Sequence, residues 1–380
     1  MKGEKAKQFI NNILTPMDIR INGNRPWDIQ IKNPKFYQRV LSGGSLALGE
    51  SYMDGWWDCN ALDEFFKRLL EYRIDKKAKS LKPTILWAVF KARFMNLQRG
   101  ARAFIIGRQH YDTGNALFKV MLDKGLNYSC GYWHNARNLD EAQTRKLDLI
   151  CRKIGLKQGM TVLDIGCGWG GFAKYAAETY GVKVKGVTVS NEQAGYARER
   201  CKSLDVTIEL ADYRDLNEKF DRIVSIGMFE HVGWKNYKTF MAVVHRCLKD
   251  DGLFLLHTIA GNTPSRDTDP WIGTYIFPNS MLPSASQISR AAEGLFILED
   301  LHSLGRYYDR TLMAWYDNFT QNWDRLKDQY DMRFFRMWSY YLLSCAASFR
   351  SRRNQLWQIV FSKQGIDRVF RSEGELFIQP

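Results

Sequence analysis

The amino-acid sequence predicts an α/β protein in which a smaller, mainly helical N-terminal domain precedes a parallel sheet. With 380 residues, the chain is longer than a single hydrophobic core usually supports. Residues 140–260 alternate between short β-rich runs and helical stretches, which is typical of βαβ units. The first 60 residues instead mix polar turns with apolar pairs, as short helices or hairpins do. We therefore predict two domains, 1–108 and 109–380.

Five strands with helices between them are predicted for the sheet. They cover residues 161–165, 182–187, 206–210, 222–225 and 252–257. After Pro283 we expect a helix, followed by strands at 295–301 and 311–315. Residues 315–363 are rich in aromatic side chains and are predicted to form long C-terminal helices.

Positive charge is concentrated near the N-terminus. The formal net charge is +14, and residues 1–110 hold 20 Lys and Arg against 10 Asp and Glu. From Thr84 onward, apolar residues at three- and four-residue spacing with interspersed Lys and Arg predict a basic amphipathic helix. Such a helix either packs on the core with a solvated charged face or lies on a membrane surface. The basic region favours an anionic partner, either phospholipid headgroups or nucleic acid.

The cysteines and the hydropathy pattern argue against several classes of protein. The seven cysteines are scattered without a CxxC pair, so neither a disulfide framework nor a metal site is expected. No apolar run approaches the roughly 18 residues that a membrane-spanning helix needs. The N-terminus lacks the apolar region of a signal peptide, and we expect the protein in the cytoplasm.

A glycine-rich run, Val162-Leu-Asp-Ile-Gly-Cys-Gly-Trp-Gly-Gly171, follows the first of these strands and precedes a helix expected at 172–179. Glycines let the backbone pass close beneath a ligand, and the N-terminus of the helix favours negative charge. The form DxGCGxGG differs from the dinucleotide pattern GxGxxG, and we assign it to S-adenosylmethionine (SAM). A structural turn without a ligand is the alternative. The predicted cofactor residues here are Leu163, Asp164, Gly166, Cys167, Gly168, Gly170 and Gly171.

The next two strand ends supply further candidate cofactor contacts. The second strand ends without the acidic residue that usually holds ribose hydroxyls in such folds. Neutral hydrogen bonds are expected there instead, from Thr188, Ser190, Asn191 and Gln193. The third strand end places Asp212 or its neighbours Tyr213 and Arg214 near the adenine. The alternative for Asp212 is to cap the turn that follows it.

Acidic and imidazole side chains follow the fourth and fifth strands. Ligands bind beyond the carboxyl ends of the strands in open parallel sheets, so Glu230, His231 and His257 are expected to converge beside the cofactor. A single histidine is more often a satisfied core residue. A Glu and a His from adjacent strand ends are better suited to acid/base work or to holding an anion.

Ordered motifs on both sides of the glycine-rich run span nearly the whole chain. They are Gly49-Glu-Ser-Tyr-Met-Asp-Gly-Trp-Trp57, His110-Tyr-Asp-Thr-Gly-Asn115, Tyr128-Ser-Cys-Gly-Tyr-Trp133, Gly227-Met-Phe-Glu-His-Val-Gly233, Phe254-Leu-Leu-His-Thr-Ile259, Tyr275-Ile-Phe-Pro278, Tyr308-Asp309, Thr311-Leu-Met-Ala-Trp315 and Gln355-Leu-Trp-Gln358. With these motifs the sequence resembles the cyclopropane-fatty-acyl-phospholipid synthases and their relatives, the mycolic acid cyclopropane synthases. The resemblance implies a Rossmann-like class I SAM-dependent methyltransferase sheet, and it adds Tyr128 and Ser129 to the cofactor residues.

The resemblance also implies a mechanism. In that family, a cis double bond of a phospholipid acyl chain attacks the sulfonium methyl, and the resulting carbocation loses a proton to a bound bicarbonate as the ring closes. The residues that would hold the bicarbonate are Cys130, Glu230, His257, Ile259 and Tyr308, the first and fourth through backbone groups. Cys345 matches a cysteine that family descriptions mark as an active-site residue, and its alternative role is that of a small buried apolar side chain.

The same chemistry is consistent with the residues themselves. An alkene is a weak nucleophile that no general base can activate, so a Ser/His/Asp set is not required. The site must align the carbons, exclude water and offer one proton acceptor. Aromatic walls also stabilise a passing cation, and the candidates are Phe229, Tyr308, Trp315 and Tyr316.

The predicted function is transfer of a methylene group from SAM to unsaturated phospholipid acyl chains. Domain 1–108 would dock on the lipid surface, and 109–380 would be the catalytic domain with a helical insert at the substrate pocket and C-terminal helices. The expected location is the cytoplasm, peripherally at the inner face of the membrane, and the resemblance allows a homodimer. The alternatives are a SAM-dependent methyltransferase that makes methyl-branched lipids and a nucleic-acid methyltransferase. We expect no nucleic-acid partner, because the sequence carries no NPPY-type motif or recognisable RNA-binding module.

Overall fold

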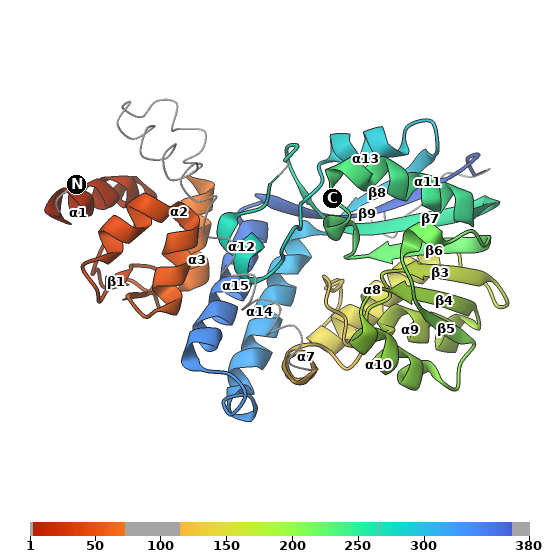
Figure 1. Ribbon diagram of the computed structural model, residues 1–380, viewed down its shortest axis with the longest axis horizontal. Coiled ribbons are helices and arrows are strands. Elements are labelled where there is room, and N and C mark those ends of the chain that lie inside the picture. Colours follow the sequence, from red (N-terminus) through yellow and green to blue (C-terminus); the bar gives the residue numbers. More distant parts are fainter. Residues whose placement is uncertain (1–2, 73–114, 266, 367–380) are drawn as a thin grey trace. The chain divides into compact units, whose positions relative to one another are not determined.

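The computed structural model describes residues 3–72, 115–265 and 267–366. The chain forms two compact units, whose elements are labelled in Figure 1. As far as they are described, Leu122–Arg266, Ser280–Thr311 and Asn354–Pro380 form the sheet unit. Met1–Met121, Asp267–Asn279 and Leu312–Arg353 form the helical unit. Each unit is therefore assembled from three segments that are far apart in the sequence.

The sheet unit contains a seven-stranded sheet with the order β5-β4-β3-β6-β7-β9-β8. The five strands from β5 to β7 in this order run parallel, and β9 is antiparallel to both of its neighbours. The strands are β3 (Thr161–Ile165), β4 (Lys183–Thr188), β5 (Val206–Leu210), β6 (Phe220–Ile226), β7 (Leu248–Gly261), β8 (Ile297–Ser303) and β9 (Asn354–Ser362).

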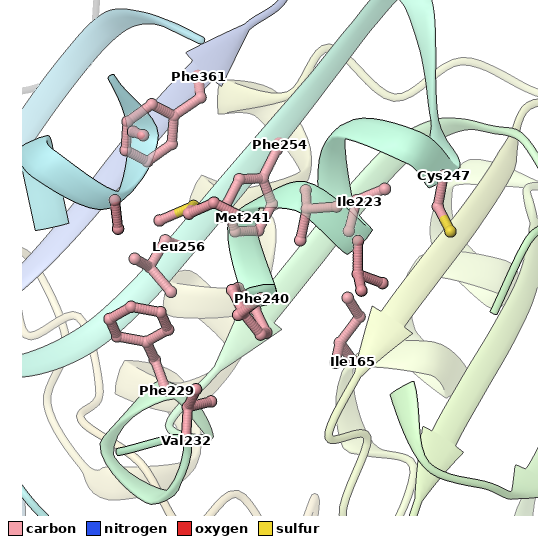
Figure 2. Close-up of a cluster of buried hydrophobic side chains, with 14 of the residues drawn as sticks. Ile165, Ile223, Phe229, Val232, Phe240, Met241, Cys247, Phe254, Leu256 and Phe361 are labelled. Atoms are coloured by element: carbon pink, nitrogen blue, oxygen red, sulfur yellow. The ribbon is translucent and has the colours of Figure 1, made fainter. Parts of the chain in front are cut away.

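Helices cover both faces of this sheet. The helices of the unit are α8 (Leu139–Lys153), α9 (Gly171–Tyr180), α10 (Asn191–Cys201), α11 (Tyr237–Cys247) and α13 (Ala285–Ala292). On one face, Phe254 and Leu256 of β7 pack in a cluster with α11 and α13 (Figure 2). Leu255 packs on the other face with α8 and α9. Because side chains alternate along a strand, His257 and Ile259 lie on the same side of the sheet as Leu255. This is the side that α8 covers.

The helical unit is built around aromatic side chains. Its helices are α1 (Gly3–Leu14), α2 (Phe36–Met53), α3 (Leu62–Glu71), α7 (Ala116–Met121), α12 (Pro270–Tyr275), most of α14 (Gly305–Gln321) and α15 (Met332–Arg350), and it has two short strands, β1 (Gln30–Ile31) and β2 (Trp57–Asp58). The ring of Tyr340 lies 4.4 Å from that of Trp271 and 5.0 Å from that of Phe66. A Cβ on Gly49 would come within 2.3 Å of Trp271, so this contact requires glycine.

The structure confirms the α/β prediction and the five central strands, whose ends differ by a few residues from those predicted. Two predictions are wrong. Residues 311–315 belong to α14, because Leu312, Trp315 and Phe319 are buried at helical spacing. Residues 354–362 form β9 and are not helical. This strand is buried on both faces, and hydrophobic periodicity does not separate such a strand from a buried helix.

Several predictions fall on residues that the structure does not describe. The basic amphipathic helix from Thr84 lies outside the described residues, as do the domain boundary at residue 108 and nearly all of the motif at 110–115. The two-domain division at 108 therefore stays a prediction. Among the described helices, none is both long enough and apolar enough to cross a membrane.

Candidate active site

The glycine-rich run forms the turn between β3 and α9. Gly166, Gly168 and Gly170 have φ values of 86°, 53° and 77°, which other residues rarely adopt. A Cβ on Gly166 would also lie 2.7 Å from Met228, so the backbone there leaves no room for a side chain. Leu163, Asp164 and Cys167 are buried in or beside this turn. The predicted cofactor turn therefore has the strand-turn-helix form that the sequence required.

A segment outside the glycine run, Asp123–Cys130, packs against this turn. A Cβ on Gly171 would lie 2.8 Å from the backbone oxygen of Gly125, so the two backbones approach closely. The carboxylate of Asp123 accepts hydrogen bonds from the backbone N–H groups of Gly125 and Asn127, each at 2.8 Å. This segment carries Tyr128 and Ser129, whose contact with the cofactor stays a prediction.

The buried ammonium of Lys146, on α8, holds this segment. Its Nζ donates to Oγ of Ser129 at 3.0 Å and to Oδ1 of Asn127 at 3.4 Å. Burial lowers the pKa of Lys146 to about 8, while attraction to Asp123 and Asp164 opposes the shift. Burial likewise raises the pKa of Asp164 to about 7 against the attraction of Lys146. Lys146 is therefore a buried cation at the base of the cofactor turn.

The polar residues after β4 bond to one another. Ser190 caps α10 by accepting from the N–H of Gln193, and Oγ1 of Thr188 donates to Oε1 of Gln193 at 3.1 Å. Asn191 is the exposed first residue of α10. Thr188, Ser190 and Gln193 thus form one ordered strand end, which is suited to neutral hydrogen bonds with a ligand.

The capping alternative for Asp212 is confirmed. Asp212 accepts from the backbone N–H of Arg214 at 2.9 Å, and the guanidinium of Arg214 binds the same carboxylate. These hydrogen bonds lower the pKa of Asp212. The ring of Tyr213 meets Phe240 edge-on at 5.3 Å. Whether any of the three also contacts the adenine stays a prediction.

Glu230 is buried just beyond the end of β6. The pairing of β6 with β7 ends at Ile226 and His257. The next backbone N–H on this edge of β7 therefore has no partner on β6 and can bond to Oε1 of Glu230. The N–H of Ile259 donates to this oxygen at 2.6 Å. Oε2 has no hydrogen-bond partner among the residues that the structure describes. Burial raises the pKa of Glu230 to about 7, against the hydrogen bond from Ile259.

His257 is fully buried on β7, two residues from Ile259. Burial lowers its pKa well below the ordinary value, and the positive charges of Lys146 and Lys153 add to this shift. Its Nε2 lacks a hydrogen-bond partner within the described ranges. Glu230 and His257 therefore each present one unsatisfied polar atom in the same buried region of β7, which can bind a small polar ligand.

Thr311 joins the loop after Cys130 to α14, the helix that carries Tyr308. The hydroxyl of Thr311 accepts from the backbone N–H of Gly131 at 3.1 Å and from Nε1 of Trp133 at 2.8 Å. Tyr308 lies three residues earlier on α14, on the same helix face as Thr311. Burial raises the pKa of the Cys130 thiol far above its ordinary range, so its sulfur is not a nucleophile at neutral pH.

We also expected His231, Phe229, Trp315, Tyr316 and Cys345 in or near the site. The side chain of His231 is exposed, and the ring of Phe229 is fully buried in the core, stacked on Tyr237 at 4.3 Å. Phe229 is therefore part of a core cluster, and its role as a pocket wall stays a prediction. Trp315, Tyr316 and Cys345 belong to the helical unit, where burial raises the pKa of Cys345 to about 12 and keeps its thiol protonated.

Lys146, Gln143 and Thr311 were not predicted from the sequence. Gln143 donates to the backbone oxygen of Ser129 at 2.7 Å from the same buried face of α8. A signal was present for two of them, because Gln143 and Lys146 alternate with Leu147 and Ile150 on the apolar stripe of a helix. Polar residues on such a stripe indicate buried hydrogen bonds.

Comparisons with known proteins show which family the chain resembles. The family model of "Mycolic acid cyclopropane synthetase" matches residues 98–359. The chain is 54% identical over 365 residues to the cyclopropane-fatty-acyl-phospholipid synthase of Escherichia coli K12, a match that covers 96% of this chain and 95% of that one. It is 36% identical over 271 residues to a probable fatty acid methyltransferase of Pseudomonas putida, covering 68% and 69% of the two chains.

Among solved structures, mycolic acid cyclopropane synthase CmaA1 complexed with SAH and CTAB matches with a TM-score of 0.63 and 34% identity. The match covers 68% of this chain and 98% of that one. The sheet order and this likeness confirm the predicted Rossmann-like class I methyltransferase fold.

The Lys146 contacts lead to a prediction about cofactor affinity. We expect Lys146→Met to weaken SAM binding by about tenfold, because Ser129 and Asn127 lose a charged donor. Lys153→Met is the matched control, since this buried lysine of α8 pairs with Asp300 at 2.8 Å instead. Titration calorimetry should show weakened binding only for the first variant. Equal losses of SAM affinity in both variants would show that any buried lysine of α8 has this effect, and that the contact of Lys146 with Ser129 and Asn127 is not its cause.

The raised pKa of Glu230 leads to a prediction about stability. Between pH 4.5 and 7 the folded state holds a proton that the unfolded state has released, so this group lowers stability as the pH rises. Glu230→Gln removes that loss and keeps an acceptor for Ile259. In urea unfolding at pH 8, we expect the variant to be more stable by about 3 kcal/mol. The gap should shrink as the pH falls toward 4.5, and a gap independent of pH would contradict the assignment.

Proposed function

This chain belongs to the mycolic acid cyclopropane synthetase family, and we propose on that premise that it forms cyclopropane fatty acids in phospholipids. The reaction would transfer a methylene group from SAM to the cis double bond of an unsaturated acyl chain. The observation that carries this proposal is the 54% identity to a cyclopropane-fatty-acyl-phospholipid synthase over nearly the full length of both chains.

The chain is a SAM-dependent one-carbon transferase with a Rossmann-like sheet. In our proposal, SAM lies over the turn of Gly166, Gly168 and Gly170, and the N-terminus of α9 faces its methionine carboxylate. Thr188 and Gln193 would hold the ribose through neutral hydrogen bonds. The sulfonium supplies the electrophile, so the protein itself must only align the alkene carbons and exclude water.

The residues around β7 fit a small oxyanion that serves as the base. Oε2 of Glu230 and Nε2 of His257 are buried polar atoms that lack a partner in the described part of the chain. A protonated carboxyl and a neutral imidazole N–H can both donate to an oxyanion. Bound bicarbonate would supply the acceptor for the proton released on ring closure. Tyr308 would contribute its hydroxyl, and Cys130 and Ile259 their backbone groups.

The proposed binding to a lipid surface rests on the positive charge near the N-terminus. The basic region near the N-terminus would bind anionic headgroups, and the enzyme would act peripherally at the cytoplasmic face of the membrane. A homodimer would then add avidity, because two basic regions would bind one surface. Trp315 and Tyr316 stay candidates for the wall of the acyl-chain pocket.

A methyltransferase that makes methyl-branched lipids is the second candidate. The similarity to a probable fatty acid methyltransferase favours it over a nucleic-acid methyltransferase. The two lipid reactions share the cofactor and the cationic intermediate, and they differ in where the cation loses its proton.

A product assay tests the proposed substrate class. The enzyme is incubated with methyl-labelled SAM, vesicles of unsaturated phospholipid and RNA. We expect label only in the acyl chains, which gain one methylene unit and lose their double bond, as read by mass spectrometry. Label in RNA, or an acyl chain that gains mass and keeps its double bond, would contradict the proposal.

Salt dependence tests the docking role of the basic region. Turnover on vesicles with anionic lipid should fall as ionic strength rises, because salt screens the attraction between exposed charges. Vesicles of neutral lipid should give low turnover at every salt concentration. The same rates in both vesicle types would refute electrostatic docking and leave the chemistry of the site untouched.

A further inference from the structure

The Gln355-Leu-Trp-Gln358 motif places an amide beside the candidate site histidine. Gln358 of β9 is paired in register with His257 of β7, and both side chains are fully buried. Val360 of β9 packs on the α8 face, so Gln358 lies on that face as well. Nε2 of Gln358 lies 3.3 Å from Nδ1 of His257, and neither side chain makes another hydrogen bond within the described ranges.

The ring of His257 is neutral at physiological pH. Burial disfavours its charged form, and the cations of Lys146 and Lys153 disfavour it further. Lys153 is itself paired with Asp300, and the neighbouring His302 is held neutral because burial lowers its pKa to about 4. A neutral imidazole carries one proton on one of its two nitrogens. The hydrogen bond at Nδ1 therefore determines whether Nε2 carries the proton and donates, or carries a lone pair and accepts.

We propose that Gln358 is a positioning residue that fixes His257 in the tautomer with its proton on Nε2. The amide NH2 of Gln358 donates to the lone pair of Nδ1, and the ring N–H is left at Nε2, which has no protein partner among the described residues. This assignment rests on the proposed function in one respect, namely that Nε2 meets an oxyanion.

The two tautomers differ in what they offer such a ligand. With the proton on Nε2, the ring donates a hydrogen bond to an oxygen lone pair. With the proton on Nδ1, Nε2 would present its own lone pair to the anion and repel it. Because burial and two lysines prevent the ring from gaining a second proton, the neutral amide of Gln358 is the group that selects the binding form.

The direct test is the nitrogen NMR spectrum of the full-length protein labelled with 15N-histidine. A His257→Gln variant identifies the two His257 signals by their loss. In the wild-type protein we expect a pyrrole-type shift for Nε2 and a pyridine-type shift for Nδ1, unchanged from pH 6 to 8. A pyrrole-type Nδ1, or a ring that titrates in this range, would overturn the inference.

A variant pair separates the amide from a general packing effect. In Gln358→Met the volume is kept and the donor is removed, so both His257 nitrogens should move toward averaged shifts. We expect kcat to fall about tenfold and SAM affinity to stay unchanged. Gln355→Met is the matched control, because Gln355 lies on the other face of β9 and bonds to Asn262 at 3.1 Å. It should leave the His257 shifts as in the wild-type protein.

The outcomes for the two proposals are distinguishable. The shifts decide the role of Gln358 even in a protein that forms no cyclopropane, and the lipid product decides the proposed function whatever the tautomer. If Gln358→Met fails to fold, the wild-type spectrum alone decides the inference. Unaltered His257 shifts in a folded Gln358→Met variant would refute it.

Discussion

A set of polar side chains buried on the α8 face of the sheet is the constraint on which the sheet unit depends. Lys146, Lys153, His257 and Gln358 lie there beside the apolar residues that α8, β7 and β9 contribute to the same face. Burying such groups costs free energy unless each finds a hydrogen bond or an opposite charge. Lys153 pairs with Asp300, and Lys146 donates to Ser129. Within the described residues, the side chain of His257 bonds only to Gln358. The apolar cluster on the opposite face, around Phe254, offsets part of this cost (Figure 2).

The same residues join the cofactor turn to the candidate proton acceptor. Lys146 contacts the segment that carries Ser129, and its charge acts on both Asp164 and His257. Thr311 ties the loop after Cys130 to the helix that carries Tyr308. These buried links connect the segment beside the glycine turn with α8 and α14. Unsatisfied atoms in such a site reduce stability, a cost that many proteins accept at functional positions.

The sequence was informative where chemistry and periodicity agree. The glycine turn and the parallel strands follow local rules that can be recognised from residue order. The hydrogen bond between Glu230 and the backbone of Ile259 joins residues that are 29 positions apart, and it was not predicted. The prediction failed where tertiary contacts decide. Residues 311–315 have β-forming side chains but are helical, because Leu312, Trp315 and Phe319 are buried along one helix face. Likewise, only the structure shows that Phe229 stacks on Tyr237 in a core cluster. The assembly of each unit from three distant segments has no local signal at all.

The central claim is that a buried acceptor site beside the cofactor turns methyl transfer into methylene transfer. The most direct measurement uses SAM with a fully deuterated methyl group and follows the label into the acyl chains by mass spectrometry. Ring closure with loss of one proton from the transferred carbon predicts a product that keeps two of the three deuterium atoms. A product that keeps all three would show that the carbon arrives and stays as a methyl group, and would contradict the account.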